Sequence, residues 1–248
     1  MCIILFAWQQ HPHYPLVVAA NRDEFHGRAT EAATWRGDAL CGLDLEAGGT
    51  WMGVNRRGTF AAVTNYREPG AVRGERSRGD IPWQLIQAAN PQPVLNTLLE
   101  EQQAFSGFNA LARLDNQLLY WSNRGATLSA LQPGLYVLSN GLLDTRWPKT
   151  ERARQALAQA LTQEQPQEAL FTALADTHQP DDRQLPDTGV GLEVERMVSS
   201  IFIRAPHYGT RASTVLLEDT AGQVTFQERR FAAGGVFADA SSFAFAKS

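Results

Sequence analysis

A cysteine directly after the initiator methionine is the residue of this chain with the clearest chemical potential. The initiator methionine is removed when the next residue is small, and its removal would give Cys2 both a thiol and a free α-amine. A thiolate is a strong nucleophile, and an α-amine with a pKa of about 8 is a competent base near neutral pH. N-terminal nucleophiles combine both groups in one residue. The other interpretation is a small apolar residue that begins a buried strand.

Polar residues gather at the ends of several expected strands, and five short motifs carry most of them. Residues 2–8 and 16–20 read as a hairpin of two strands, so the residues after position 20 are expected beside Cys2. The motifs are Asn-Arg-Asp-Glu (21–24), Gly-Gly-Thr-Trp (48–51), Thr-Asn-Tyr-Arg (64–67), Leu-Ser-Asn-Gly (138–141) and Tyr-Gly-Thr-Arg (208–211).

The first motif supplies candidate partners for the cysteine. An arginine can lower the pKa of a neighbouring thiol, and an aspartate can orient an α-amine, so Arg22 and Asp23 suit these roles. The other interpretation is a solvated turn in which Asn21 and Asp23 bond to their own backbone.

The later motifs supply donors for a developing negative charge. The Asn65 amide, at a strand end, can donate to an oxyanion, although asparagine at this position also simply ends a strand. Asn140 precedes glycine in a turn dipeptide and occupies a similar position. Arg211 can bind a carboxylate or phosphate through two N–H groups, or be a charge at a strand edge.

Two other groups of residues are weaker candidates for a functional site. A metal site would need the acidic residues at 23–24 and 44–46 to meet His26, but no helical His-Glu-x-x-His or paired-cysteine spacing supports one, so we expect no metal. The arginine-rich loop 66–79 favours a solvated segment over a mobile lid that attracts anions, because two glutamates offset part of its charge.

The elements that would position these residues alternate between blocks of strands and pairs of helices. We expect one domain over 1–248, in which residues 231–248 form a tail that docks only partially. Two helix pairs between antiparallel strands predict two packed sheets with a helical layer on each outer side. The expected strands are 2–8, 16–20, 50–54, 59–64, 108–114, 117–122, 135–139, 199–204, 212–218 and 224–230. The expected helices are 80–89, 93–103, 146–162 and 167–177, with Asp80 as the N-cap of the first.

Composition restricts the class of protein. The chain has 248 residues, 44% of them hydrophobic, and a formal net charge of −4. No basic block predicts nucleic-acid binding, and no apolar run approaches the roughly 18 residues of a membrane span. The first apolar run lacks the basic leader and cleavage site of a signal peptide. Two cysteines, Cys2 and Cys41, build no disulfide framework, so we expect a reducing cytoplasm.

Together the five motifs resemble the NRDE family, also called the transport and Golgi organization protein 2 family, over nearly the whole chain. That family is in turn distantly similar to hydrolases with an N-terminal nucleophile. The resemblance implies an α+β fold, a four-layer αββα sandwich.

The resemblance also implies roles for single residues. Cys2 corresponds to the nucleophile and Asp23 to an aspartate that supports it. Asn65 corresponds to the oxyanion asparagine, and Asn140 to a second asparagine of the hydrolase site.

Arginine is where this chain departs from the hydrolase pattern. Arg211 corresponds to a late arginine of the hydrolases, with Arg204 as the alternative. The hydrolases also carry an arginine directly before the asparagine of the first motif. Ala20 stands there in this chain, and Arg22 follows two positions later.

Two functions follow from the resemblance. The first is an N-terminal-cysteine amide hydrolase or acyltransferase that acts on a small acylated substrate and needs no cofactor. The alternative is non-catalytic handling or trafficking of haem or of acyl-lipid or coenzyme A ligands, with Cys2, His11 or His13 as candidate ligands of haem iron. In either case we expect a bacterial, cytoplasmic protein whose partner is a small molecule.

Overall fold

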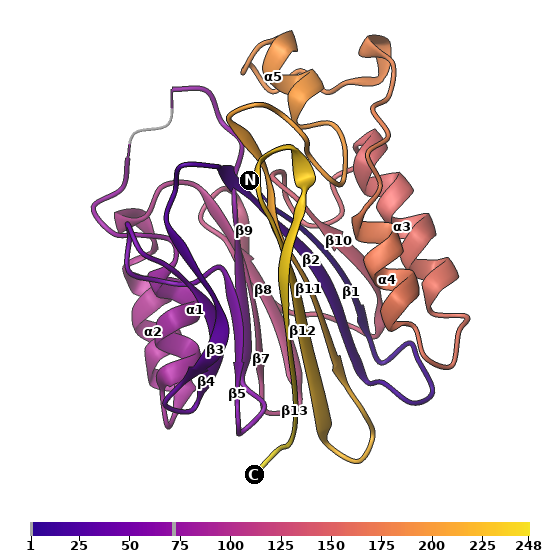
Figure 1. The fold of residues 1–248 in the computed structure, drawn as a ribbon. Coiled ribbons are helices and arrows are strands. Elements are labelled where there is room, and N and C mark those ends of the chain that lie inside the picture. The colour runs from indigo at the N-terminus through magenta and orange to yellow at the C-terminus, as the bar shows by residue number, and fades with distance from the viewer. Residues whose placement is uncertain (1, 71–72) are drawn as a thin grey trace.

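Two antiparallel sheets pack face to face, and helices cover both outer faces of the pair (Figure 1). The computed structural model describes residues 2–70 and 73–248, apart from the side chain of Ala126. This arrangement is a four-layer αββα sandwich and confirms the expected fold class.

The first sheet contains the start of the chain. Its strand order is β10-β1-β2-β11-β12-β13, and each neighbouring pair is antiparallel. The strands are β1 (Cys2–Trp8), β2 (Leu16–Phe25), β10 (Gly134–Leu138), β11 (Tyr208–Glu218), β12 (Gln223–Phe231) and β13 (Phe237–Ala246).

The second sheet runs in sequence order from β3 to β9 and is also antiparallel. Its strands are β3 (Thr30–Arg36), β4 (Ala39–Asp44), β5 (Met52–Asn55), β6 (Phe60–Asn65), β7 (Phe108–Leu114), β8 (Gln117–Ser122) and β9 (Ala126–Ala130).

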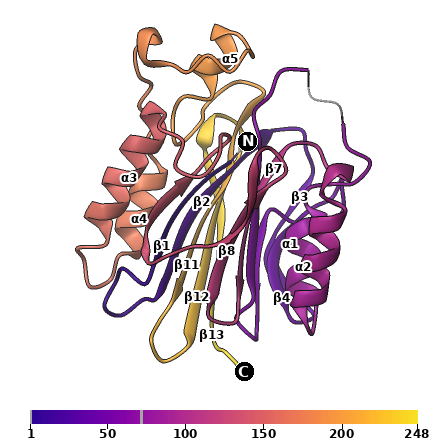
Figure 2. The same ribbon diagram turned by 180° about the vertical axis from the view of Figure 1, so that it is seen from behind.

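The helices form the two outer layers, seen from opposite sides in Figures 1 and 2. One pair packs on the second sheet, the other on the first, and a short helix lies beyond the end of the sandwich. The helices are α1 (Asp80–Gln87), α2 (Pro91–Glu100), α3 (Pro148–Ala160), α4 (Gln167–Leu174) and α5 (Leu192–Met197), with 3-10 turns at Gln102–Ala104, Asp182–Gln184 and Ala233–Gly235.

Strand β1 is apolar on both faces because each face covers a different core. Ile4 and Phe6 belong to the core between the two sheets. Ile3 and Leu5 point the opposite way, into the core beneath α3 and α4. A strand buried on both sides reads as a continuous apolar run rather than an alternating one. The same alternation continues to Cys2, which therefore shares the face of Ile4 and Phe6.

Several elements differ from the expectation. Strands β3, β4, β9 and β13 and helix α5 were not expected, and residues 199–204 form no strand. Residues 199–203 are buried and include the apolar run Ile201-Phe202-Ile203, but the ladder contact of this segment is a single bridge between Arg204 and Gly209. Burial in a loop therefore produced the apolar pattern that we attributed to a strand.

The helix ends differ in detail from the expected ones. Gly79, and not Asp80, is the N-cap of α1, and no side chain caps this helix. Asp80 lies in the first turn, where its negative charge interacts favourably with the positive end of the helix dipole. Helix α2 begins at Pro91, because Asn90 caps it by accepting a hydrogen bond from the backbone N–H of Gln92.

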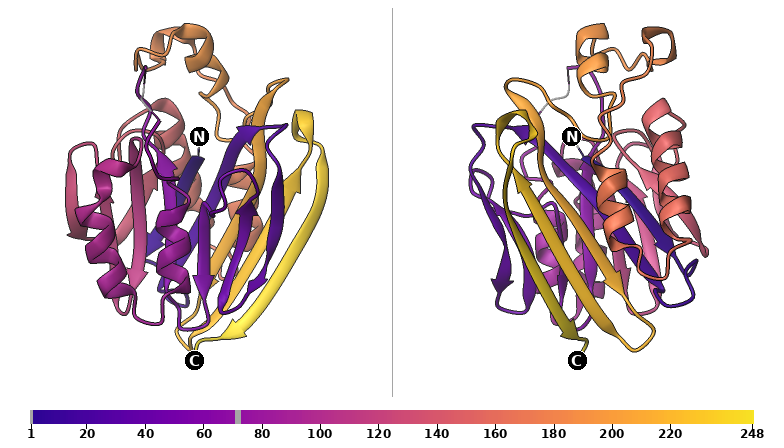
Figure 3. Two further views of the ribbon diagram at one scale, coloured as in Figure 1. Left: turned by 90° about the vertical axis from the view of Figure 1, so that its left-hand side faces the viewer. Right: turned by 45° about the vertical axis from the view of Figure 1, so that its right-hand side comes forward.

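The C-terminal segment 231–248 contains β13, which runs along β12 at the edge of the first sheet and is yellow in Figure 3. Phe243 lies opposite Phe226, and Phe245 lies opposite Val224. These aromatic residues cover the end of the central core, which is why this segment pairs along most of its length instead of docking only partially.

Candidate functional site

A cleft of about 720 Å³ opens at the end of the sandwich where β1 begins. This end also carries the segment with α5, as Figures 1 and 3 show. The cleft is lined by residues from both sheets and from the loop before α1, among them Cys2, Arg22, Asp23, Trp51, Asn65 and Arg78.

Cys2 is held at the cleft by the antiparallel pairing of β1 with β2. Cys2 lies directly opposite Arg22, so both side chains take the same face of the sheet. The cysteine is partly exposed and carries no disulfide. Burial raises the pKa of its thiol, while the charge of Arg22 and a hydrogen bond from the Asp23 backbone oppose this shift. The thiol therefore needs a base to become a nucleophile near neutral pH.

Arg22 is buried and forms an ion pair. Its guanidinium donates to the Asp44 carboxylate at 2.8 Å and to the Thr30 hydroxyl at 3.3 Å. It also stacks over the Trp51 ring, 4.6 Å from the centroid. Arg22 therefore contributes a positive charge beside Cys2 that is already paired with Asp44.

Asp23 follows on the opposite face of β2 and is also buried. The Thr210 hydroxyl donates to its carboxylate at 2.7 Å, and the Tyr208 hydroxyl donates to its backbone carbonyl at 2.8 Å. Burial raises the pKa of Asp23 to about 6, against the opposing effect of the Thr210 hydrogen bond. At pH 7 a carboxylate with this pKa is largely ionised, which suits it to orient a cationic amine.

Asn65 and Asn140 meet at the ends of β6 and β10. The Asn140 side chain donates to the backbone carbonyl of Asn65 at 2.9 Å and is fully buried. Asn65 lines the cleft, and its side-chain amide has no hydrogen-bond partner among the described residues. The structure thus leaves the Asn65 amide available to a ligand and uses Asn140 to hold Asn65 in place.

Ser139 completes this junction. Its hydroxyl donates to the Cys2 carbonyl at 3.3 Å, and its own carbonyl accepts from the Thr64 hydroxyl at 2.7 Å. The Leu-Ser-Asn-Gly motif therefore joins the ends of both sheets directly at the cysteine.

Arg211 lies away from these groups. It sits where the β11–β2 register shifts, and one of its terminal nitrogens donates to the carbonyls of Phe25, His26 and Arg28 at 2.9–3.3 Å. The guanidinium thus holds the loop after β2 and does not line the cleft. The alternative, Arg204, is exposed and stacks on Phe202, 5.4 Å from its centroid.

Lys149 is a residue that the motifs did not single out. It is 5% exposed, and its ammonium donates to the Val198 carbonyl at 3.0 Å. Burial and the charge of Arg67 lower the pKa of Lys149 to about 7, although the charges of Asp23 and Cys2 act in the opposite direction. Its rarity was the available signal, because only two of the 22 cationic residues in the chain are lysines.

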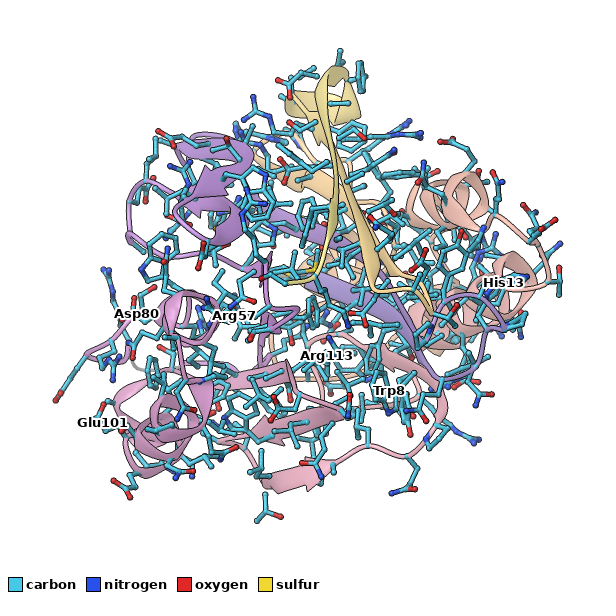
Figure 4. All side chains as sticks on the ribbon, turned by 90° about the horizontal axis from the view of Figure 1, so that it is seen from below. Trp8, His13, Arg57, Asp80, Glu101 and Arg113 are labelled. Carbon is cyan, nitrogen blue, oxygen red and sulfur yellow. The ribbon has the colours of Figure 1, made fainter. Side chains whose placement is uncertain are left out.

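The candidate haem ligands lie in two places: the ring centroids of His11 and His13 are 5.9 Å apart, and Cys2 lies at the other end of β1. His11 and His13 lie in the loop after β1, and Figure 4 shows His13 beside the helices of one outer layer. Cys2 begins the same strand, so its six residue steps separate cysteine and loop by about 20 Å. The His11 ring contacts the Gln163 carbonyl at 3.1 Å.

The acidic residues near His26 do not form a metal cluster. Asp44 accepts from Arg22 and Arg28, and Glu46 lies 3.4 Å from Arg28. Within residues 2–70 and 73–248, no group of three or more His, Cys, Asp or Glu side chains is arranged to hold a metal ion. The acidic side chains on this side of the cleft instead neutralise arginines.

The protein is thus an αββα sandwich in which Cys2 begins an inner strand of the first sheet and lines a polar cleft. The family model for Transport and Golgi organisation 2 matches residues 1–233, and the chain belongs to this family. This confirms the resemblance seen in the five motifs.

The chain is similar to several curated relatives along nearly its full length. It is 38% identical to the cow Transport and Golgi organization protein 2 homolog and 36% identical to the human one, over 92% of each chain. The Drosophila protein is 29% identical over 92% of this chain and 91% of its own. These relatives are eukaryotic, and this finding corrects our expectation of a bacterial protein.

Two solved structures are similar in arrangement at very low identity. One is a Caenorhabditis elegans ortholog of N-acylethanolamine-hydrolyzing acid amidase, with 12% identity, a TM-score of 0.46, and coverage of 88% of this chain and 92% of that one. The other is the C2A mutant of conjugated bile acid hydrolase from Clostridium perfringens, with 8% identity, a TM-score of 0.45, and coverage of 100% and 98%.

One observation bears on the expectation that no segment spans a membrane. No helix in the part of the chain that the structure describes has both the length and the hydropathy needed to cross a bilayer.

Proposed function

We propose that this protein is an N-terminal-cysteine amide hydrolase or acyltransferase that acts on a small acylated substrate and needs no cofactor. The observation that carries the proposal is the position of Cys2, which is partly exposed at the start of β1 and lines a cleft of about 720 Å³ together with Asp23 and Asn65.

The environment of the thiol favours a base on the same residue. Burial raises the pKa of the Cys2 thiol, so a proton acceptor must lie close to it. No histidine lines the cleft among the described residues. The α-amine of Cys2 would supply this base once Met1 is removed, with Asp23 to orient it. Removal of Met1 concerns a residue outside those that the structure describes.

The proposed reaction has two steps. The Cys2 sulfur attacks the acyl carbon, the thiol proton passes to the α-amine, and the Asn65 amide donates to the developing oxyanion. The carbon–nitrogen bond then breaks, and the leaving amine takes the proton from the α-ammonium. Water in a hydrolase, or an acceptor amine in a transferase, attacks the resulting thioester and restores the thiol.

Labelling of the cysteine tests this proposal. We expect intact mass analysis of the native protein to show loss of Met1, and an activated acyl probe to add one acyl group per chain. Cys2→Ala should abolish the labelling. Cys41→Ala is the matched control, because the other cysteine is fully buried and burial raises the pKa of its thiol to about 11.

Two results would contradict the proposal. Retention of Met1 in essentially all molecules would exclude the α-amine as base. Absence of labelling in the unmutated protein would favour a pocket that binds its ligand without turnover.

A further inference from the structure

The Gly-Gly-Thr-Trp motif holds the loop before α1 against the second sheet. The Thr50 N–H donates to the Gly79 carbonyl at 3.2 Å. A Cβ on Gly49 would lie 2.5 Å from the Gly79 carbonyl carbon, a distance that no real side chain tolerates. Glycine at position 49 therefore permits a backbone contact that fixes residues 77–79 beside the cleft.

This contact positions Arg78. Its guanidinium is half-buried, donates to the Gly107 carbonyl at 3.2 Å, and lines the same cleft as Cys2. Burial lowers the pKa of Arg78, and the charges of Cys2, Glu24 and Glu68 act on it in the opposite direction. The arginine is thus held in place before any ligand arrives.

The other buried or half-buried arginines of the cleft are neutralised. Arg22 pairs with Asp44 at 2.8 Å, Arg28 pairs with the same carboxylate at 2.6 Å, and Arg76 pairs with Asp80 and Glu101. Arg78 has no carboxylate within 4.0 Å among the described residues. Arg73 also has no such partner, but it is exposed to water on the loop.

From this geometry we infer that Arg78 is an anion subsite and that the substrate is an acyl compound carrying a carboxylate or a phosphate. A partly desolvated guanidinium with no carboxylate in ion-pair contact can gain a planar anionic group as partner, because the hydrogen bonds are charge-assisted. The half-buried Trp51 ring and Val63 line the same cleft and offer apolar contact to the rest of the ligand. The position of the acyl group rests on the proposed function, whereas the anion subsite does not.

Matched thioesters test the subsite without turnover. The probes are butanoyl thioesters of N-acetylcysteamine, which is neutral, of 3-mercaptopropionate and of 2-mercaptoethyl phosphate. We expect calorimetric titration of the Cys2→Ala protein to show at least one anionic thioester binding about tenfold more tightly than the neutral one. The anion that binds more tightly identifies the carboxylate or the phosphate as the source.

Substitution of Arg78 tests whether this side chain causes the preference for anionic thioesters. Adding Arg78→Gln should remove the preference for the anion, because glutamine carries no charge. Arg146→Gln is the control for net charge, since the Arg146 side chain is 87% exposed and lies outside the cleft lining. Equal affinity for neutral and anionic thioesters, absence of binding by both anionic ones, or a preference that survives Arg78→Gln would overturn the subsite.

Release of thiol by the unmutated protein separates this inference from the proposed function. Attack by Cys2 would break the carbon–sulfur bond of the probe, and the departing thiolate would take the proton. An anion preference in the Cys2→Ala protein without thiol release by the native protein supports the subsite and contradicts the reaction. Thiol release that is equally fast for all three probes, with no preference in binding, contradicts the subsite and supports the reaction.

Discussion

Asp23 and Lys149, two buried ionisable residues near Cys2, have pKa values shifted in opposite directions. Burial raises the pKa of Asp23 to about 6 and lowers that of Lys149 to about 7. Burial disfavours the charged form of each residue, while the charge of each favours ionisation of the other. Their protonation near neutral pH therefore depends on one another, as is common where proton transfer takes place.

Lys149 predicts a pH dependence of stability. In the unfolded chain the lysine takes up a proton below its ordinary pKa of 10.5, whereas in the folded protein it does so only near pH 7. Lowering the pH from 10 to 7 therefore destabilises the native protein relative to Lys149→Met, by on the order of 3 kcal/mol.

Urea unfolding of both proteins at several pH values measures this difference. Lys247→Met removes the only other lysine and is the control. A difference between native protein and Lys149→Met that stays constant from pH 7 to 10 would show that Lys149 is not buried as an amine.

At the scale of elements, the loop before α1 and the loop before β5 depend on one contact. Gly49→Ala would place a methyl group 2.5 Å from the Gly79 carbonyl carbon, which belongs to the backbone and cannot rotate away. We expect a loss of about 1–3 kcal/mol in the free energy of unfolding, together with weaker binding of the anionic thioester, because Arg78 moves with Gly79.

Gly27→Ala is the matched control for this substitution, because a Cβ there would meet nothing within 4 Å and its backbone conformation is open to other residues. Calorimetry and thermal unfolding of both variants provide the comparison. Unchanged stability and binding in Gly49→Ala would show that the loop does not depend on this contact.

At the scale of the whole molecule, a buried ion pair joins the segment with α5 to the end of β6. Arg67 donates to Glu195 at 2.5 Å, with side chains 4% and 3% exposed, and stacks on Trp147, 4.6 Å from its centroid. The Thr188 backbone N–H donates to the same carboxylate at 3.0 Å. These contacts connect three segments that are far apart in the sequence.

Removing one partner of this pair should destabilise the fold strongly. Glu195→Gln leaves the Arg67 guanidinium buried without a counter-charge, and we expect a loss of about 3–5 kcal/mol. The double variant Arg67→Met/Glu195→Gln should lose less than the sum of the single losses, because no uncompensated charge remains. Urea unfolding measures all three, and additive losses would contradict a direct pairing.

The local pattern of apolar and polar residues was sufficient to predict the first two strands, which carry Cys2. The apolar run Cys2–Trp8, the turn and the strand that follows predicted the β1–β2 hairpin, because a doubly buried strand needs a continuous apolar stretch. The polar residues after that strand had to lie near Cys2, since antiparallel pairing sets Arg22 opposite it. Edge strands such as β3 and β13 have weaker patterns and were missed.

The sequence by itself therefore determined the fold class and the family, and it predicted that Arg22, Asp23 and Asn65 lie near Cys2. Tertiary structure decided what cannot be read locally: Arg211 binds loop carbonyls, Lys149 is buried against Val198, and Arg78 is placed by Gly49. The physical reason is distance along the chain. A side chain's charge, burial and partner depend on residues dozens of positions away, and those meet only when the two sheets pack.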